Sequence, residues 1–316
     1  MAPTARSTAS PTATGPAAAL RDREEVATRL LAASDRHSFD PDKELDWDAP
    51  FTDGLWYWPP ELVSLYDTPL WRRMSEEQRI LLSKHEASSI AAAGIWFETI
   101  LMQLLLRHIY DHAPTSGHAR YALTEIADEC RHSKMFARLI TTLDTPLYGP
   151  TTVDHHLARF LKSFSTTPGS FTGTLLCEEI LDWMQRLVFP DERVQPLMRG
   201  VTRIHVIEES RHVRYAREEL RRQMLTAGRA EKAYVRGLTA EIARVVMRTL
   251  ISPRAYAECG IDPKAAMAQA RRSPHRRETL RASAAKLVAF FDETGVLDGP
   301  ASRAVWRTTG LLAGRG

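Results

Sequence analysis

Cysteine is scarce in this sequence. Three cysteines occur in 316 residues, Cys130, Cys177 and Cys259, and no two of them form a Cys-x-x-Cys pair. So few cysteines argue against a disulfide framework and are typical of a protein from the reducing cytosol. We therefore predict a cytoplasmic location.

Uninterrupted hydrophobic runs are missing as well. The most apolar stretch, residues 90–109, contains Glu98 and Arg107, so it predicts a buried bundle helix and not a membrane span. The N-terminal residues lack the continuous apolar run of a secretory signal. Their content of Ala, Thr, Ser and Pro predicts a disordered tail over residues 1–20.

An excess of charge and a nucleotide fingerprint are also lacking. The formal net charge of +3 is small for this length and gives no reason to expect a nucleic acid or an acidic membrane as partner. No Gly-x-Gly-x-x-Gly follows a predicted strand, so electrons for any redox chemistry have to come from a separate donor. No stretch alternates with a period of two residues, which predicts an all-α fold.

Helical periodicity and breaks divide the chain. After the tail, residues 21–74 form an N-terminal segment that begins with a short helix and wraps the body with its tryptophans. Residues 75–293 form one helical domain, which the capping-box sequence Ser-Glu-Glu-Gln opens, and residues 294–316 form a loosely ordered C-terminal tail. The domain is predicted to contain helices over 75–111, 117–142, 152–165, 170–188, 196–226, 229–251, 262–271 and 276–293.

Two segments of the chain repeat each other at a distance of 80 residues. Residues 128–138 read DECRHSKMFAR and residues 208–217 read EESRHVRYAR, so each contains Glu-x-x-His. The same offset relates WFETIL to LCEEIL, each with a glutamate 31 residues before the motif glutamate. This is the duplicated ligand set of a carboxylate-bridged pair of iron or manganese ions in a four-helix bundle. The predicted ligands are Glu98, Glu129, His132, Glu178, Glu209 and His212.

Two positions of the repeat leave a choice. Helical periodicity favours Glu179 over Glu178 as the inward residue, but the repeat favours Glu178, and we follow the repeat. His205 occupies the place of Glu125 in the first copy, one turn before its motif glutamate. Spacing alone allows His205 either to bind metal or to hold a ligand by a hydrogen bond, and we expect Glu125 to accept such a bond.

Charged residues that adjoin the two motifs are predicted to support them. Asp128 and Glu208 each precede a motif glutamate and are expected to hold an imidazole N–H or an arginine. Arg131 and Arg211 are repeated too, and we expect them to form salt bridges.

With these residues in view, the chain resembles the di-iron arylamine N-oxygenases of the AurF type. The likeness extends over residues 45–250 and is carried by EEQRILLSKHEASSIAAAGIWFE, DECRH, LLCEEIL, the Val-Gln-Pro of residues 194–196 and HVIEESRH. In that family a further histidine four residues before the last motif glutamate binds metal, and this position is His205 here. The family's glutamate on the preceding helix matches Glu178.

The resemblance implies a ferritin-like bundle, a homodimer and a role in natural product biosynthesis. It implies two iron ions, with manganese as an alternative, that use O2 to oxidise the nitrogen of a small aromatic amine to hydroxylamine, nitroso and nitro products. A separate reductase or ferredoxin would supply the electrons. A carbon hydroxylase on the same scaffold and a non-catalytic iron-binding or helical interaction protein are the alternatives. A radical subunit of ribonucleotide reductase is disfavoured, because Phe136 stands where such proteins carry a tyrosine.

Overall fold

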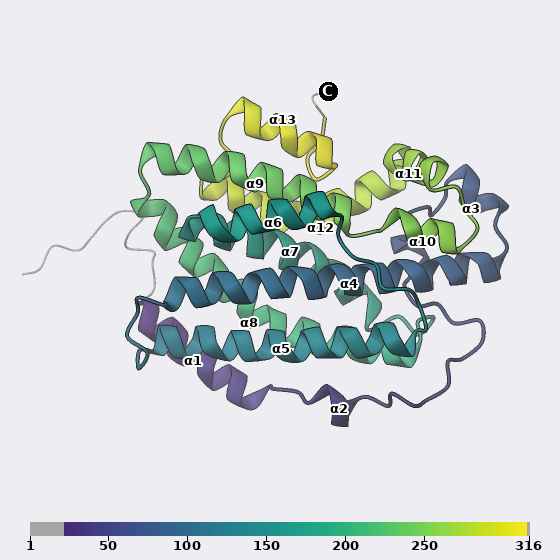
Figure 1. Ribbon diagram of the computed structural model, residues 1–316, viewed down its shortest axis with the longest axis horizontal. Helices are drawn as coiled ribbons and strands as arrows, with labels where there is room; N and C mark the ends of the chain where they lie inside the picture. Colours follow the sequence, from purple (N-terminus) through teal and green to yellow (C-terminus); the bar gives the residue numbers. More distant parts are fainter. Residues whose placement is uncertain (1–21, 315–316) are drawn as a thin grey trace, which may run out of the picture.

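Four long helices form the body of the protein in the computed structural model, which describes residues 22–314 (Figure 1). Helix α4 packs along α5, and α7 packs along α8. The bundle consists of α4 (Glu76–Ile109), α5 (Gly117–Thr142), α7 (Thr167–Val188) and α8 (Pro196–Thr226). An isolated bridge between Trp56 and Val194 is the one β-type pairing in the described part of the chain. The predicted all-α class is confirmed.

Local sequence fixes where the bundle helices begin. The Ser75 hydroxyl accepts from the backbone N–H of Gln78, whose side chain accepts from the backbone N–H of Ser75, and this is the predicted capping box. Helix α7 begins at Thr167, three residues earlier than predicted, because Thr166 caps it and Pro168 fits its first turn.

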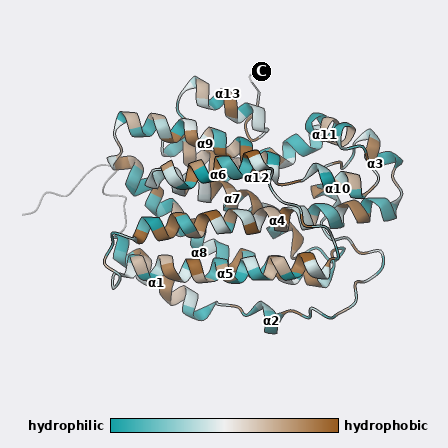
Figure 2. Ribbon diagram, in the orientation of Figure 1, coloured by the Kyte–Doolittle hydropathy of each residue, from teal (hydrophilic) through white to brown (hydrophobic). Residues whose placement is uncertain are grey.

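Helix α4 is long and apolar enough to cross a membrane by length and composition alone. In this fold it is a core helix, since 61% of its most apolar window is buried inside the protein. It lies beside α5 in the bundle, and its ribbon shows hydrophobic stretches with polar residues interspersed among them (Figure 2). The buried polar positions include Glu86 and Glu98, so this helix carries both apolar packing and ionisable groups into the interior.

Shorter helices cover the bundle. Helix α1 packs on α5 and α8, α6 lies on α4, and α9 and α12 pack on α7. The flanking elements are α1 (Arg23–Arg36), α2 (Pro41–Glu44), a 3-10 turn (Pro60–Leu62), α3 (Pro69–Arg73), α6 (Thr152–Phe164), α9 (Arg229–Thr249), α10 (Pro253–Glu258), α11 (Pro263–Arg272), α12 (Pro274–Glu293) and α13 (Pro300–Thr309).

The C-terminal end of the chain differs from its prediction, whereas the N-terminal segment that the structure describes packs on the body as predicted. The predicted tail over residues 1–20 lies outside the described residues, and the following segment buries Trp47 and Trp58 against the core. The loosely ordered tail predicted from residue 294 is wrong for α13. There Trp306 is 0% exposed and packs edge-on against Phe291 at 5.9 Å between ring centroids. One large aromatic side chain outweighs the small residues around it, because it buries far more apolar area.

Candidate metal centre

All of the residues predicted as ligands meet inside the four-helix bundle. Helices α4 and α7 each contribute one glutamate, α5 contributes one Glu-x-x-His, and α8 contributes the other together with His205. Each side chain belongs to at least one group of three residues whose potential ligand atoms lie within 4.8 Å of one another. None is more than 4% exposed: Glu98, Glu129, His132, Glu178, His205, Glu209 and His212.

The two motif glutamates lie between the two motif histidines. Glu129 places one carboxylate oxygen 2.9 Å from Nδ1 of His212 and the other 3.3 Å from Nδ1 of His132. Glu209 places its Oε1 3.1 Å from Nδ1 of His212 and 3.2 Å from Nδ1 of His132. Each carboxylate therefore reaches both imidazoles, which is the arrangement that a bridging ligand requires.

His205 points its Nε2 toward the same centre. That nitrogen lies 3.7 Å from Oε1 of Glu98 and 3.6 Å from Oε1 of Glu209. Its other nitrogen, Nδ1, donates to the side-chain oxygen of Gln185 at 2.7 Å. Because Gln185 fixes the ring, the second nitrogen is free to face a cation.

Gln185 and Ser133 were missed by the sequence analysis. Gln185 stands seven residues after Glu178, two helical turns along the same face, and this spacing is the signal that could have found it. The Ser133 hydroxyl donates to Oε2 of Glu98 at 2.6 Å and steers that carboxylate from the neighbouring helix. Neither residue has a counterpart of its own type 80 positions away, so the repeat could not predict that they contact the centre.

The acidic residues before the motifs hold the histidines in a crossed pattern. The Nε2–H of His132, on α5, donates to Glu208 on α8 at 2.7 Å. The Nε2–H of His212, on α8, donates to Asp128 on α5 at 3.2 Å. Since a carboxylate only accepts, these bonds place the protons on Nε2 and leave Nδ1 of both rings turned to the centre.

Two arginines form ion pairs with the acidic residues that hold the histidines. Arg131 pairs with Asp128 and, at 3.2 Å, with Glu208, while Arg211 lies 3.1 Å from Asp128 and 3.9 Å from Glu208. Burial raises the pKa of Asp128, but the hydrogen bond and charge of His212 and the charge of Arg131 lower it to about 2. The predicted salt bridges therefore link α5 to α8 directly outside the centre.

Unpaired buried oxygens indicate that the centre suits cations. Oε1 of Glu98, Oε1 of Glu129 and Oε2 of Glu209 are buried without a hydrogen-bond partner among the described residues. Burial raises the pKa of Glu98, and burial together with the charge of Glu209 raises that of Glu178 well above its usual range. Carboxylates in such surroundings are costly unless positive charge compensates them, so the residues present fit a pair of divalent metal ions.

Glu125 differs from its expectation. Both of its carboxylate oxygens are buried without a hydrogen-bond partner in the part of the chain that the structure describes, so the bond expected from a histidine is absent. Instead Glu125 forms a group with Glu129 and His212, with ligand atoms within 4.8 Å of one another. It can thus offer a further carboxylate to a metal ion, in the place that His205 takes in the second copy.

Glu179, the alternative to Glu178, points away from the centre and forms an ion pair with Arg217.

A helical bundle that gathers carboxylates and imidazoles from duplicated Glu-x-x-His segments defines a ferritin-like di-metal protein. The family model of the p-aminobenzoate N-oxygenase AurF matches residues 20–295, and the chain belongs to this family of di-metal oxidoreductases.

Similar proteins include uncharacterised mycobacterial ones and a solved oxidase. One relative, from Mycobacterium tuberculosis, is 27% identical over 303 residues, which cover 90% of this chain and 86% of the relative. Another, from Mycobacterium bovis, is 27% identical over 299 residues with the same coverage. An R2-like ligand-binding oxidase with a Mn/Fe cofactor is similar in structure, with a TM-score of 0.44, 10% identity and 92% of each chain covered. A form of that oxidase with a Mn/Mn cofactor gives a TM-score of 0.42 and 12% identity over 79% of this chain and 89% of the other.

Proposed function

We propose that the protein is an O2-dependent di-metal N-oxygenase that oxidises the amino nitrogen of a small aromatic amine. Two iron ions, or manganese in their place, would bind at the centre, and a separate reductase or ferredoxin would deliver electrons. The observation that carries the proposal is the convergence of seven buried carboxylates and imidazoles from four helices, together with membership of the N-oxygenase family.

Bound metal ions would supply the activation of O2, and the chain's own residues would prepare the site. Glu129 and Glu209 face both motif histidines, and their neighbours hold the imidazole rings in a fixed tautomer. Phe136 packs against the His205 ring at 5.0 Å between ring centroids and helps to keep water away from it. Phe136 also supplies no oxidisable phenol, which favours an oxygenase over a radical-storing subunit.

The proposal is tested by loading the protein with Fe(II) without O2, then adding O2, a reductant and an aminoarene. Hydroxylamine, nitroso or nitro products by mass spectrometry support it, while ring-hydroxylated products favour the carbon hydroxylase. Absence of bound metal and of O2 consumption favours a helical interaction protein. Glu178→Gln is expected to lose metal and activity, whereas its neighbour Glu179→Gln provides the matched control, because Glu179 pairs with Arg217 outside the centre.

A further inference from the structure

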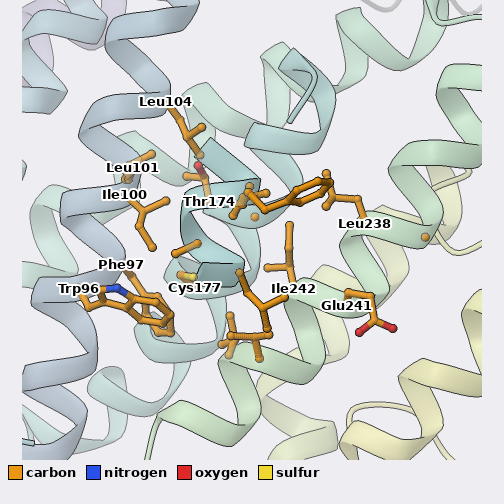
Figure 3. A pocket seen from close by; sticks show the side chains of 18 of the residues that line it. Trp96, Phe97, Ile100, Leu101, Leu104, Thr174, Cys177, Leu238, Glu241 and Ile242 are labelled. Atoms are coloured by element: carbon orange, nitrogen blue, oxygen red, sulfur yellow. The ribbon is translucent and has the colours of Figure 1, made fainter. Parts of the chain in front are cut away.

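A cavity of about 460 Å³ lies beside the metal centre, between α4, α6, α7 and α9. Its wall is almost entirely hydrophobic. Figure 3 shows side chains from three of these helices turned toward one space, with Ile100 and Leu101 on α4, Cys177 on α7, and Leu238 and Ile242 on α9. The volume falls within the range of about 300–1,000 Å³ that is usual for sites of small organic ligands.

The inner end of this cavity reaches the candidate metal ligands. Phe97, Cys177 and Glu178 line it, and the same three residues line a smaller cavity of about 30 Å³. The smaller cavity is also lined by Glu98 and His205. A molecule in the large cavity would therefore place one end against Glu178, at the edge of the di-metal centre.

The charges along the cavity select against an anion. No lysine, arginine or histidine lines it, and its two charged residues are both acidic. Glu178 lies at the inner end, and Glu241 is exposed and pairs with Arg244. With an amine at the Glu178 end, a carboxylate at the other end of the same molecule would lie among apolar side chains and lose its hydration without gaining a cationic partner, which is costly.

The size of the cavity exceeds that of a single ring. An engineered protein cavity of about 150 Å³ holds one benzene molecule, and this cavity is about three times as large. A one-ring substrate would leave most of the apolar wall without contacts, whereas two rings, or one ring with an alkyl chain, would cover it.

We infer that the site takes a primary amine on an extended apolar body of at least two rings or of similar length, without a carboxylate. The amine would lie at the Glu178 end and the apolar body between α4, α7 and α9. The choice of an amine rests on the proposed function, but the size and the exclusion of carboxylates rest on the cavity. Single-ring aminobenzoates would then be poor ligands, even though the family takes its description from one.

Binding can be tested apart from catalysis with the full chain loaded with Mn(II), kept free of O2 and reductant. Titration calorimetry with 4-aminobiphenyl and with p-aminobenzoate should give affinities that differ by about 100-fold or more in favour of 4-aminobiphenyl. Leu238→Trp, which fills part of the cavity, should weaken 4-aminobiphenyl at least tenfold and leave aniline nearly unaffected. Equal affinities, or tighter binding of p-aminobenzoate, would overturn the inference.

A charge placed in the wall gives a second test. Ile242→Arg should weaken 4-aminobiphenyl and strengthen p-aminobenzoate, while Met247→Arg, which adds the same charge to α9 away from the cavity, should change neither. If 4-aminobiphenyl does not bind and Ile242→Arg converts a dimer to a monomer, the wall is an interface between copies and the inference is wrong. Binding of 4-aminobiphenyl without oxidation would refute the N-oxygenase alone. Efficient oxidation of p-aminobenzoate would refute the inferred substrate class alone.

Discussion

Replacement of Glu208 by glutamine removes one negative charge from directly outside the metal centre. The Glu208 carboxylate accepts the Nε2–H of His132 at 2.7 Å and the backbone N–H of Phe39 at 3.1 Å. A glutamine oxygen can still accept a hydrogen bond, so the ring keeps a partner. What is lost is the charge that makes the imidazole a better electron donor to a cation.

The magnitude follows from how such partners act in other metal sites. Loss of an outer carboxylate typically lowers metal affinity 10- to 100-fold, which corresponds to about 1.4–2.8 kcal/mol. The cost to folding should be smaller, because Arg131 is 30% exposed and keeps its ion pair with Asp128. We therefore expect Glu208→Gln to weaken metal binding more than it weakens the fold.

Anaerobic titration with Fe(II) gives the affinity, and urea unfolding of the metal-free protein gives the stability. Asp128→Asn should produce a loss of the same order, because Asp128 holds His212 as Glu208 holds His132. Glu218→Gln, on the same helix but outside the centre, is the control. Metal affinities within twofold of the wild type in both outer-carboxylate variants would refute the reasoning, as would a loss of affinity that the loss of folding stability fully explains.

Three further predictions concern the metal and the buried carboxylates. Mn(II) at about 100 times its dissociation constant should stabilise the fold by about 2.7 kcal/mol for each site and raise the melting temperature by roughly 4 °C or more, and calorimetry that shows no rise would contradict the centre. His205→Ala should lower metal stoichiometry or affinity, and unchanged values would place His205 outside the ligand set. Burial raises the pKa of Glu86 from 4.5 to about 7. A carboxyl group whose pKa is higher in the folded than in the unfolded state destabilises the fold as pH rises from 4.5 to 7. In urea unfolding, the stability of Glu86→Gln relative to wild type should therefore increase by about 2–3 kcal/mol between pH 5 and pH 8. A difference that stays constant with pH would argue against the raised pKa of Glu86.

The helices of the bundle were predictable because their signals are local. The Ser75 capping box, the break before Gly117 and Pro196 in the first turn of α8 act within a few residues of each boundary. The buried tryptophan of α13 has no such signal, since its place depends on Phe291 of a different helix. Sequence periodicity cannot show that kind of packing.

The candidate ligands were predictable because both copies of the repeat have the same spacing between the first glutamate and the Glu-x-x-His motif. At Glu178 the repeat was a better guide than hydrophobic periodicity, because a buried bundle helix is apolar on several faces. Glu179 points away from the centre and forms an ion pair with Arg217. Residues that act across helices were harder to find. Gln185 and Ser133 each contact one ligand on a neighbouring helix, and only the folded arrangement brings them there.

The crossed hydrogen bonds make the two halves of the repeat dependent on each other. Asp128 of the first half holds the histidine of the second, and Glu208 does the reverse, so neither half alone orients its own imidazole.

The halves are nevertheless unequal where His205 replaces Glu125. One group combines two imidazoles, those of His132 and His205, with the carboxylate of Glu98, whereas another combines His212 with the carboxylates of Glu125 and Glu129. At this position the first copy therefore offers a carboxylate and the second an imidazole, so the duplication has produced two chemically different ends of one centre. His205 and Glu98 also line the small cavity that adjoins the large one, and Glu125 does not. The imidazole-rich end is therefore the one that a substrate in the cavity would meet.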